Sequence, residues 1–262
     1  MILADVFCSS QVARDCEFQT TPLDSPLVVQ FASSNSTDFA QAARLVAPYA
    51  SAVDLNCGCP QRWAAKQRLG GYLMSADPQL IHSMVRETRN LASLPVSVKI
   101  RIHKDNPEKT IELVKQIESA GASWVTIHAR DIKQRSTECP DWNTFHMIKQ
   151  SVQIPLVANG SILSMDEAER VAKITGCNGI MAARGLLANP AMFNGNDITP
   201  IETIYEFVRN SLKYGSSSFV FQQHLSFMLE KRLDPSQRKL FHTLCGTPAI
   251  LDFLNENIFQ VL

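Results

Sequence analysis

The 262-residue chain has no long apolar run and no excess of charge of either sign. No stretch approaches the roughly 18 apolar residues of a membrane-spanning helix. The first residues, Met-Ile-Leu-Ala-Asp, lack the basic segment and the apolar length of a signal peptide. Because the formal net charge is zero, no whole-surface attraction to nucleic acid or membrane exists, and an anionic partner must bind a local basic patch. We therefore predict a cytoplasmic protein without membrane contact.

Signals for metal and dinucleotide sites are also missing. No His or Cys cluster has the spacing of a zinc site, so we predict no metal. The seven cysteines are an odd, scattered set, which favours reduced thiols over a disulfide framework. The G-x-G-x-x-G fingerprint is absent, and this disfavours a doubly wound dinucleotide-binding sheet.

The sequence does contain a repeated alternation of strand-like and helix-like segments. Six short runs rich in Val, Ile and Leu lie at residues 26–32, 52–58, 96–102, 124–130, 155–160 and 179–184. They lack strict alternation of apolar and polar residues, as is typical of buried parallel strands. Helix signals lie between them: Asp77 before Pro78 as an N-cap, Gly121 as a C′ residue, and a capping-box match at residues 164–167.

Strand–helix repeats of this size predict a parallel sheet or a TIM barrel. A polar residue lies at or near the carboxyl end of each run: Gln30, Asn56, Lys99, His128, Asn159 and Arg184. A barrel gathers those ends into one ring, so we predict an α/β fold, a TIM (β/α)8-type barrel over residues 1–195. Only six units are visible and residues 1–6 read as the end of an earlier strand. We therefore expect a barrel that lacks its first strand and most of the second.

The last part of the chain has helical patterns alone. Apolar residues at three- and four-residue spacing occupy residues 201–213, 219–232, 235–244 and 247–258. This pattern predicts a C-terminal all-α bundle at residues 200–262, joined to the barrel by a linker at 194–200.

The most informative segment is residues 54–60, Asp-Leu-Asn-Cys-Gly-Cys-Pro. A strand ends there in the Asn56 carboxamide and a thiol, Cys59, held by a Gly-Cys-Pro turn. Cysteine thiols are mostly protonated at neutral pH, so Cys59 can donate a proton to a carbanion. Two alternatives remain for this segment: a buried structural cysteine, and a metal site at Cys57 and Cys59.

Two neighbouring strands end in pairs of cationic residues, Lys99 with Arg101 and His128 with Arg130. Such charges on a buried strand are costly unless an anion meets them. The alternatives are solvated charges on an edge strand and a histidine satisfied within the core.

The last two strands end in loops of small residues, Asn159-Gly160-Ser161 and Ala183-Arg184. Such loops let backbone N–H groups approach a phosphate, although Gly185 fits an ordinary turn equally well. The amide of Gln30 both donates and accepts, which suits an isoalloxazine or a uracil edge. A cationic, glycine-edged pocket with one thiol acid fits an anion-forming, phosphate-bearing cofactor, and FMN is the natural candidate.

The ordered set of motifs resembles the tRNA-dihydrouridine synthases, and within them the 20a/20b subgroup, over nearly the whole chain. The motifs are Asn-Cys-Gly-Cys-Pro (56–60), Gly-Gly-Tyr-Leu-Met (70–74), Val-Lys-Ile-Arg (98–101), His-Ala-Arg (128–130), Asn-Gly (159–160) and Arg-Gly-Leu-Leu-Ala-Asn-Pro (184–190).

The resemblance implies an FMN-dependent reductase of uridine in the tRNA D-loop, with NADPH as the reductant. It implies that Cys59 is the general acid and that Asn56 and Arg101 face the uracil or the flavin. The implied FMN contacts are Gln30, Lys99, His128, Asn159, Gly160, Ser161, Ala183 and Arg184. We expect a monomer.

The chain departs from the family pattern at two loops. The family usually has Asn-Gly-Asp where this chain has Ser161, and Gly-Arg where it has Ala183. The family also opens with an Ala-Pro-Met strand upstream of the residues matched here. Two other functions therefore stay open: a catalytically inactive tRNA-binding isoform, and an FMN-dependent, dihydroorotate dehydrogenase-like oxidoreductase acting on a free pyrimidine.

Two basic clusters are candidates for contact with tRNA. Arg62, Lys66 and Arg68 follow the cysteine turn, and residues 231, 232, 238 and 239 form the second cluster. A solvated charged face explains either cluster equally well.

Overall fold

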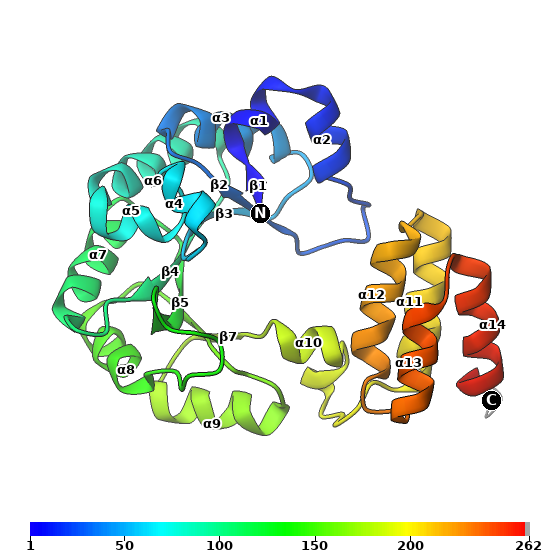
Figure 1. Cartoon of the computed structure of the whole chain (residues 1–262). Helices are drawn as coiled ribbons and strands as arrows, with labels where there is room; N and C mark the ends of the chain where they lie inside the picture. Colours follow the sequence, from blue (N-terminus) through cyan, green and yellow to red (C-terminus); the bar gives the residue numbers. More distant parts are fainter. Residues whose placement is uncertain (260–262) are drawn as a thin grey trace. The chain divides into compact units, whose positions relative to one another are not determined.

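One parallel sheet of seven strands organises the first part of the chain (Figure 1). The computed structural model describes residues 1–259. The strands are β1 (Ile2–Leu3), β2 (Val28–Ala32), β3 (Ala52–Cys57), β4 (Val96–Ile102), β5 (Trp124–Asp131), β6 (Leu156–Asn159) and β7 (Gly179–Met181). Their order across the sheet is their order in the chain, as strand–helix–strand crossovers produce. This topology is the α/β barrel type that the sequence predicts.

Helices fill the connections between strands and the whole C-terminal part. They are α1 (Ala4–Ser9), α2 (Gln11–Glu17), α3 (Ser36–Val46), α4 (Arg62–Lys66), α5 (Gly71–Ala76), α6 (Pro78–Ala92), α7 (Pro107–Ser119), α8 (Trp142–Ser151), α9 (Met165–Thr175), α10 (Arg184–Ala188), the 3-10 turn η1 (Met192–Asn194), α11 (Ile201–Tyr214), α12 (Ser218–Leu229), α13 (Pro235–Thr243) and α14 (Thr247–Asn257).

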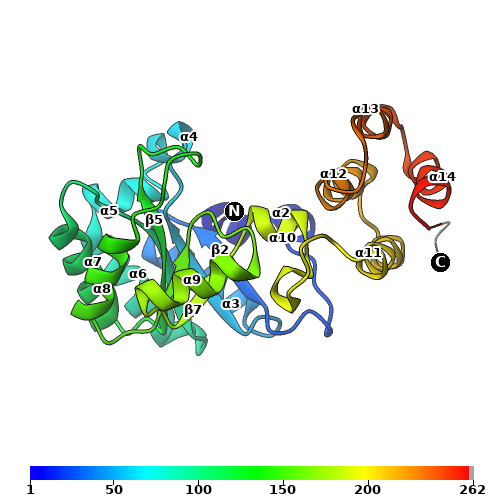
Figure 2. The same cartoon turned by 90° about the horizontal axis from the view of Figure 1, so that it is seen from below.

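The chain divides into two compact units. Residues 1–160 with 171–181 form the first, and residues 161–170 with 182–262 form the second. In the first unit, α3, α6, α7 and α8 lie along the outside of the sheet (Figures 1 and 2). In the second unit, α11 to α14 pack around a core that includes Phe221, Leu225 and Phe253. The predicted division into domains at 1–195 and 200–262 stays a prediction.

The two faces of the sheet differ in chemistry. Leu55, Val98, Ile100, Val125 and Ile127 are fully buried and face the helices. Residues that alternate with them are polar, and they project from the opposite face. The apolar face packs the sheet against the helices, and the polar face provides the side chains that could bind a ligand.

The predicted strand at residues 96–102 matches β4, and the ends of the other five agree with the observed ones to within three residues. At the seventh, β7 ends at Met181, because Ala183 is already the N-cap of α10. The strand predicted at residues 1–6 covers only Ile2–Leu3, after which α1 begins. The sequence patterns did not reveal α1 or α2.

The predicted helix ends also hold with one difference. Asp77 caps α6 and Gly121 follows α7 with a positive φ of 88°. At α9, Ser164 accepts from the Glu167 N–H, but the Glu167 carboxylate accepts from the Leu163 N–H rather than from Ser164. The second half of the predicted capping box is therefore wrong by one residue.

Within residues 1–259, no helix combines the length and apolar character needed to cross a membrane.

The cap of α6 gives a stability prediction. The Asp77 carboxylate accepts a hydrogen bond from the Leu80 N–H at 3.1 Å. We expect Asp77→Ala to lower the free energy of unfolding by about 1 kcal/mol in urea titrations. Asp77→Asn keeps an acceptor and serves as the control. Equal losses in both variants would contradict the capping role.

Candidate active site

Strand register brings most of the predicted site residues onto one face of the sheet. In parallel pairs, facing residues project to the same side. Asn56 pairs with Lys99, Arg101 with His128, and His128 with Asn159. One layer below, Gln30 pairs with Asp54, and Asp54 with Ser97. The polar face of the first unit is therefore a continuous set of amide, carboxylate and cationic groups at the carboxyl ends of the strands.

The turn after β3 is shaped by the Asn56 side chain. Its Oδ1 accepts from the backbone N–H groups of Gly58 at 3.1 Å and Cys59 at 3.0 Å. This is an Asx turn, in which a side-chain amide replaces backbone pairing beyond the end of a strand. It fixes the backbone of Cys59, whose side chain packs against the apolar cluster of Ala32, Ala64 and Leu69.

The two thiols of the segment lie in different environments. Cys57 is the last residue of β3 and is fully buried among apolar groups. Burial, and to a smaller degree the charge of Asp54, raises the pKa of Cys57 well above its usual value. Cys59 is only partly buried. Of these two thiols, only Cys59 has exposed surface.

Two glycines, Gly70 and Gly71, contact the Cys59 backbone. Gly71 N–H donates to the Cys59 carbonyl at 3.0 Å. Gly70 has a φ of 62°, and a Cβ added there would lie 2.8 Å from Cys59 Cβ and 2.9 Å from its carbonyl oxygen. Only glycine fits at position 70, for reasons of both backbone conformation and space.

Asp54 is a site residue that sequence reasoning missed. Its Oδ1 accepts from Ser97 Oγ at 2.5 Å and its Oδ2 from Gln30 Nε2 at 2.7 Å. Burial raises the pKa of Asp54, although both hydrogen bonds and the charge of Lys99 oppose the rise. Its place two residues before Asn56 on the same strand was the signal that could have revealed it.

Lys99 and Arg101 differ in their partners. Burial lowers the pKa of Lys99, and attraction to Asp54 partly offsets this. Within residues 1–259, Lys99 Nζ makes no hydrogen bond or ion pair. Arg101 is tethered instead, because its guanidinium donates to the carbonyls of Gly58 at 2.9 Å and Asp131 at 2.8 Å.

His128 is held by its neighbour on β5. Arg130 is buried, and its Nε donates to the Glu138 carbonyl at 2.7 Å. Its Nη1 lies 3.0 Å from His128 Nε2. Because a guanidinium can only donate, Nε2 must accept, and the imidazole proton lies on Nδ1. The predicted cationic pair is thus an arginine that orients a neutral histidine.

The end of β6 approaches the histidine. Asn159 is buried, and its Nδ2 donates to the Met181 carbonyl at 2.9 Å. Gly160 has a φ of 144°, and a Cβ there would lie 3.4 Å from His128 Cδ2. The first unit therefore contains eight of the predicted residues: Gln30, Asn56, Cys59, Lys99, Arg101, His128, Asn159 and Gly160.

The other three predicted residues belong to the second unit. Ser161 has a φ of 48°, and Arg184 Nη2 donates to its hydroxyl at 3.5 Å. Ala183 precedes them as the N-cap of α10. The part of these three residues in a cofactor site stays a prediction.

Comparisons with known proteins fit this arrangement. The profile described as "Dihydrouridine synthase (Dus)" matches residues 1–244. The chain belongs to the dihydrouridine synthase family. A mouse tRNA-dihydrouridine(20a/20b) synthase-like protein is 45% identical over 260 residues, which cover 98% of this chain and 79% of the mouse protein. The human counterpart is 43% identical with 81% of its length covered, and the Schizosaccharomyces pombe tRNA-dihydrouridine(20a/20b) synthase is 35% identical with 78% covered.

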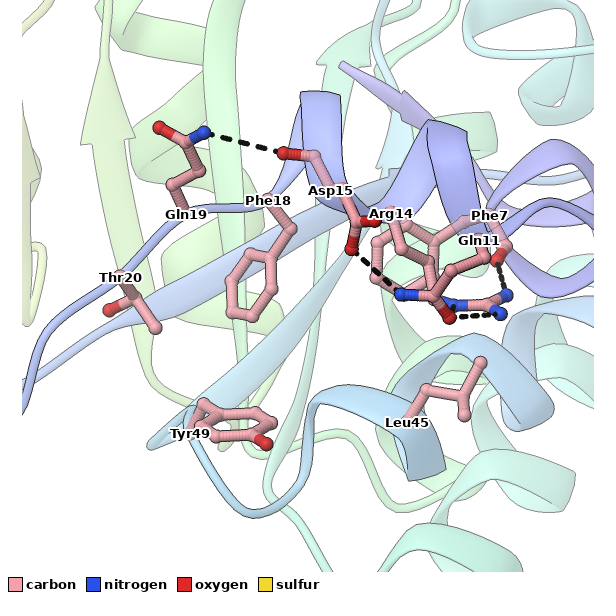
Figure 3. A pocket seen from close by; sticks show the side chains of 9 residues that line it. All are labelled: Phe7, Gln11, Arg14, Asp15, Phe18, Gln19, Thr20, Leu45 and Tyr49. Atoms are coloured by element: carbon pink, nitrogen blue, oxygen red, sulfur yellow. Dashed lines mark hydrogen bonds between the residues drawn. The ribbon is translucent and has the colours of Figure 1, made fainter. Parts of the chain in front are cut away.

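The largest cavity of this dihydrouridine synthase homologue among those described lies away from the polar face. It has a volume of about 500 Å³ and lies between α2, the end of α3 and the strand-flanking loops (Figure 3). Its lining residues are Phe7, Gln11, Arg14, Asp15, Phe18, Gln19, Thr20, Leu45 and Tyr49. None of them is a predicted site residue. Arg14 Nη1 already donates to the Phe7 carbonyl at 2.6 Å, and its other nitrogens donate to Gln11.

The basic clusters of this family member differ in how freely they can contact RNA. Arg62, Lys66 and Arg68 are all exposed beside the Cys59 turn. In the second cluster, Lys231 Nζ donates to the Asp197 carbonyl at 3.2 Å and Arg232 Nε to the Thr199 carbonyl at 2.8 Å. These two cations stabilise a loop of the second unit, a role that the sequence did not reveal.

The buried thiol of this dihydrouridine synthase homologue predicts a pH effect on stability. Cys57 has a raised pKa in the folded chain, so its contribution is fully present below 9.0, the value of an ordinary thiol, and is lost as the pH rises. Above that pH, we expect the free energy of unfolding to fall by up to about 1.4 kcal/mol per pH unit through this group. Urea titrations between pH 8 and pH 10 measure it, with Cys57→Ala lacking that part of the slope. Parallel curves for both proteins would contradict the assignment.

The support of Cys59 by Gly70 gives a second prediction for this dihydrouridine synthase homologue. Gly176 has a similar φ of 65° but has nothing within 4 Å of an added Cβ. Gly70 also has a ψ of −133°, so Gly70→Ala combines the contact with Cys59 and a backbone conformation that only glycine adopts readily. We expect Gly70→Ala to cost about 1–3 kcal/mol more than Gly176→Ala in urea titrations. Equal costs would mean that Cys59 moves away without penalty.

Proposed function

We propose that this chain is a tRNA-dihydrouridine synthase that reduces the C5=C6 bond of uridine in the tRNA D-loop. FMN is the cofactor, NADPH the reductant, and Cys59 the donor of the proton to C5. The observation that carries the proposal is the in-register polar face with Gln30, Asn56, Lys99 and His128, to which the Cys59 turn is hydrogen-bonded through Asn56. The names of the relatives support the same reaction. Several of these names specify positions 20a and 20b of the tRNA, which we take as the uridines to test.

The polar face fits FMN. The half-buried Lys99 ammonium has no hydrogen-bond partner among residues 1–259 and calls for an anionic group. Gly160 lets the loop after β6 pass close to His128 and Pro140, because a Cβ there would lie 3.3 Å from Pro140 and 3.4 Å from His128. When bound, FMN carries the hydride of NADPH to C6 of the uracil. In the proposal, Lys99 stabilises the negative charge of the reduced cofactor, and Gln30, His128, Asn159, Ser161, Ala183 and Arg184 complete its contacts.

In the proposed reaction, Cys59 supplies the proton that must follow the hydride. Hydride addition at C6 leaves a carbanion at C5, conjugated with the C4 carbonyl. The Cys59 thiol gives its proton to C5, and the thiolate then recovers a proton from water. Burial lowers the pKa of Arg101, while attraction to Asp131 and to the Cys59 thiolate acts in the opposite direction. Arg101 therefore lies near enough to stabilise the thiolate that the reaction leaves.

The RNA must present a uridine that is splayed out of its fold. The segment that follows Cys59 exposes Arg62, Lys66 and Arg68. The sequence contains no Asp or Glu between residues 54 and 77. We propose that they contact tRNA phosphates close to the flipped uridine. Phosphate contacts of this kind position the RNA without reading its sequence.

The proposal predicts unequal roles for Cys57, at the end of β3, and Cys59, in the turn that follows. We expect Cys59→Ala to lower dihydrouridine formation on unmodified tRNA by 10²-fold or more, the range of general acid catalysis, with flavin retained. Cys57→Ala makes the same chemical change two residues away and should keep the rate within a few-fold. Mass spectrometry of the digested tRNA measures the product, and flavin absorbance measures the cofactor.

Two results would overturn this function. Oxidation of NADPH with orotate but not with tRNA would favour a free pyrimidine as substrate. Protein without flavin absorbance that still retards tRNA on a gel would favour a tRNA-binding isoform without activity. An unchanged product yield in Cys59→Ala would refute the assigned acid alone.

A further inference from the structure

We propose that Asp54 is a positioning residue, whose carboxylate orients the Gln30 and Asn56 amides and through them holds the Cys59 turn. The catalytic purpose of holding the Cys59 turn rests on the proposed function. The hydrogen bonds themselves are those of the folded chain.

The hydrogen bonds run in one direction from the turn to the carboxylate. Gly58 and Cys59 N–H groups donate to Asn56 Oδ1. Asn56 Nδ2 donates to Gln30 Oε1 at 2.8 Å, and Gln30 Nε2 donates to Asp54 Oδ2 at 2.7 Å. We call this series of hydrogen bonds, from the turn through Asn56 and Gln30 to Asp54, the relay. In each of its bonds the acceptor lies on the side of Asp54.

The two ends of the relay fix the orientation of both amides. Backbone N–H groups can only donate, so Asn56 must turn its oxygen to the turn. The Asp54 oxygen that faces Gln30 accepts, so Gln30 must turn its nitrogen to Asp54. Each amide leaves a second N–H that makes no hydrogen bond within the described residues 1–259. The relay therefore presents N–H donors to a bound ligand, which selects ligand edges with carbonyl oxygens, as in uracil and flavin.

Ser97 holds the other oxygen of Asp54. Its hydroxyl donates to Oδ1 at 2.5 Å, so the carboxylate is bound on both sides and cannot rotate freely. Ser97 Oγ also lies 3.5 Å from the Val53 carbonyl. The Ser97 hydroxyl can therefore donate its proton to the Val53 carbonyl instead, and its oxygen can then accept a hydrogen bond from an N–H group at position 54.

This geometry distinguishes two substitutions at position 54. In Asp54→Asn, the amide oxygen accepts from Gln30 and the amide nitrogen donates to Ser97, so the relay keeps its direction. In Asp54→Leu, the side chain is similar in size but offers no acceptor. Gln30 then loses its anchor, and the buried amide is left partly unsatisfied.

The matched control for lost stability is Leu55→Ala. Leu55 is the next residue of β3, is fully buried, and projects to the opposite face. Its truncation destabilises the same strand without touching the relay. Cys57, which is fully buried in the same segment, reports opening of the whole strand.

The first test needs no activity. Alkylation of Cys59 and Cys57 in the cofactor-free full chain is followed by peptide mass spectrometry. We expect Asp54→Leu to raise the Cys59 labelling ratio, which is the Cys59 rate in the variant over that in the wild type, by about fivefold or more, since one anchoring hydrogen bond is lost. Asp54→Asn should leave this ratio within about twofold of one, and Leu55→Ala should do the same while raising the Cys57 rate. An unchanged Cys59 ratio in Asp54→Leu would overturn the proposal, as would an equal rise in Leu55→Ala.

The second test uses the flavin-loaded enzyme and unmodified tRNA. We expect Asp54→Leu to lower kcat for dihydrouridine formation by at least about tenfold, with misplacement of the acid as the cause. Asp54→Asn should restore most of it. An Asp54→Asn variant as impaired as Asp54→Leu would overturn the relay. If wild-type protein makes no dihydrouridine, the proposed function fails, while the labelling ratio still decides on Asp54.

Discussion

The whole polar face depends on the parallel register from β2 to β6. Each facing pair, from Gln30 with Asp54 to His128 with Asn159, keeps the same side of the sheet. A shift of one residue in any strand would exchange that strand's polar set for its buried apolar set. The fully buried residues on the other face, such as Leu55 and Ile100, therefore secure the site as well as the fold. Packing against the helices specifies where the chemistry can occur.

That arrangement carries a local cost. Burial opposes ionisation at Asp54 and at Lys99, as the directions of their pKa shifts indicate. Two hydrogen bonds to Asp54 offset part of the cost, whereas Lys99 makes no hydrogen bond with residues 1–259 and is stabilised by the more distant attraction of Asp54. A site whose cation lacks a close partner is less stable than an apolar one but is prepared for an anionic ligand. The free energy comes from the rest of the fold, mainly the apolar face of the same strands.

Some of this could be predicted from the sequence, and the limits have physical causes. Val-, Ile- and Leu-rich runs revealed six of seven strands because buried parallel strands have that composition, and the Gly-Cys-Pro turn marked Cys59. Local patterns do not reveal which long-range partner a polar group finds. Asp54 was missed because its hydrogen bonds join three strands, and the tethering of Arg101 and Arg232 depends on carbonyls distant in sequence. The helices α1 and α2 escaped notice since α1 is six residues long and α2 has no buried residue.

The two thiols show how little separates a structural group from a reactive one. Cys57 and Cys59 share a residue type and lie two positions apart, and strand alternation alone would give them the same face. The strand ends between them, because Asn56 Oδ1 captures the next two backbone N–H groups. Cys57 thereby stays buried in the apolar layer with a raised pKa, and Cys59 lies beyond the strand, where it is only partly buried. The Asn56 amide, which ends the ladder with one turn, thus separates a buried thiol from an accessible one, and the groups that orient this amide contribute to that separation.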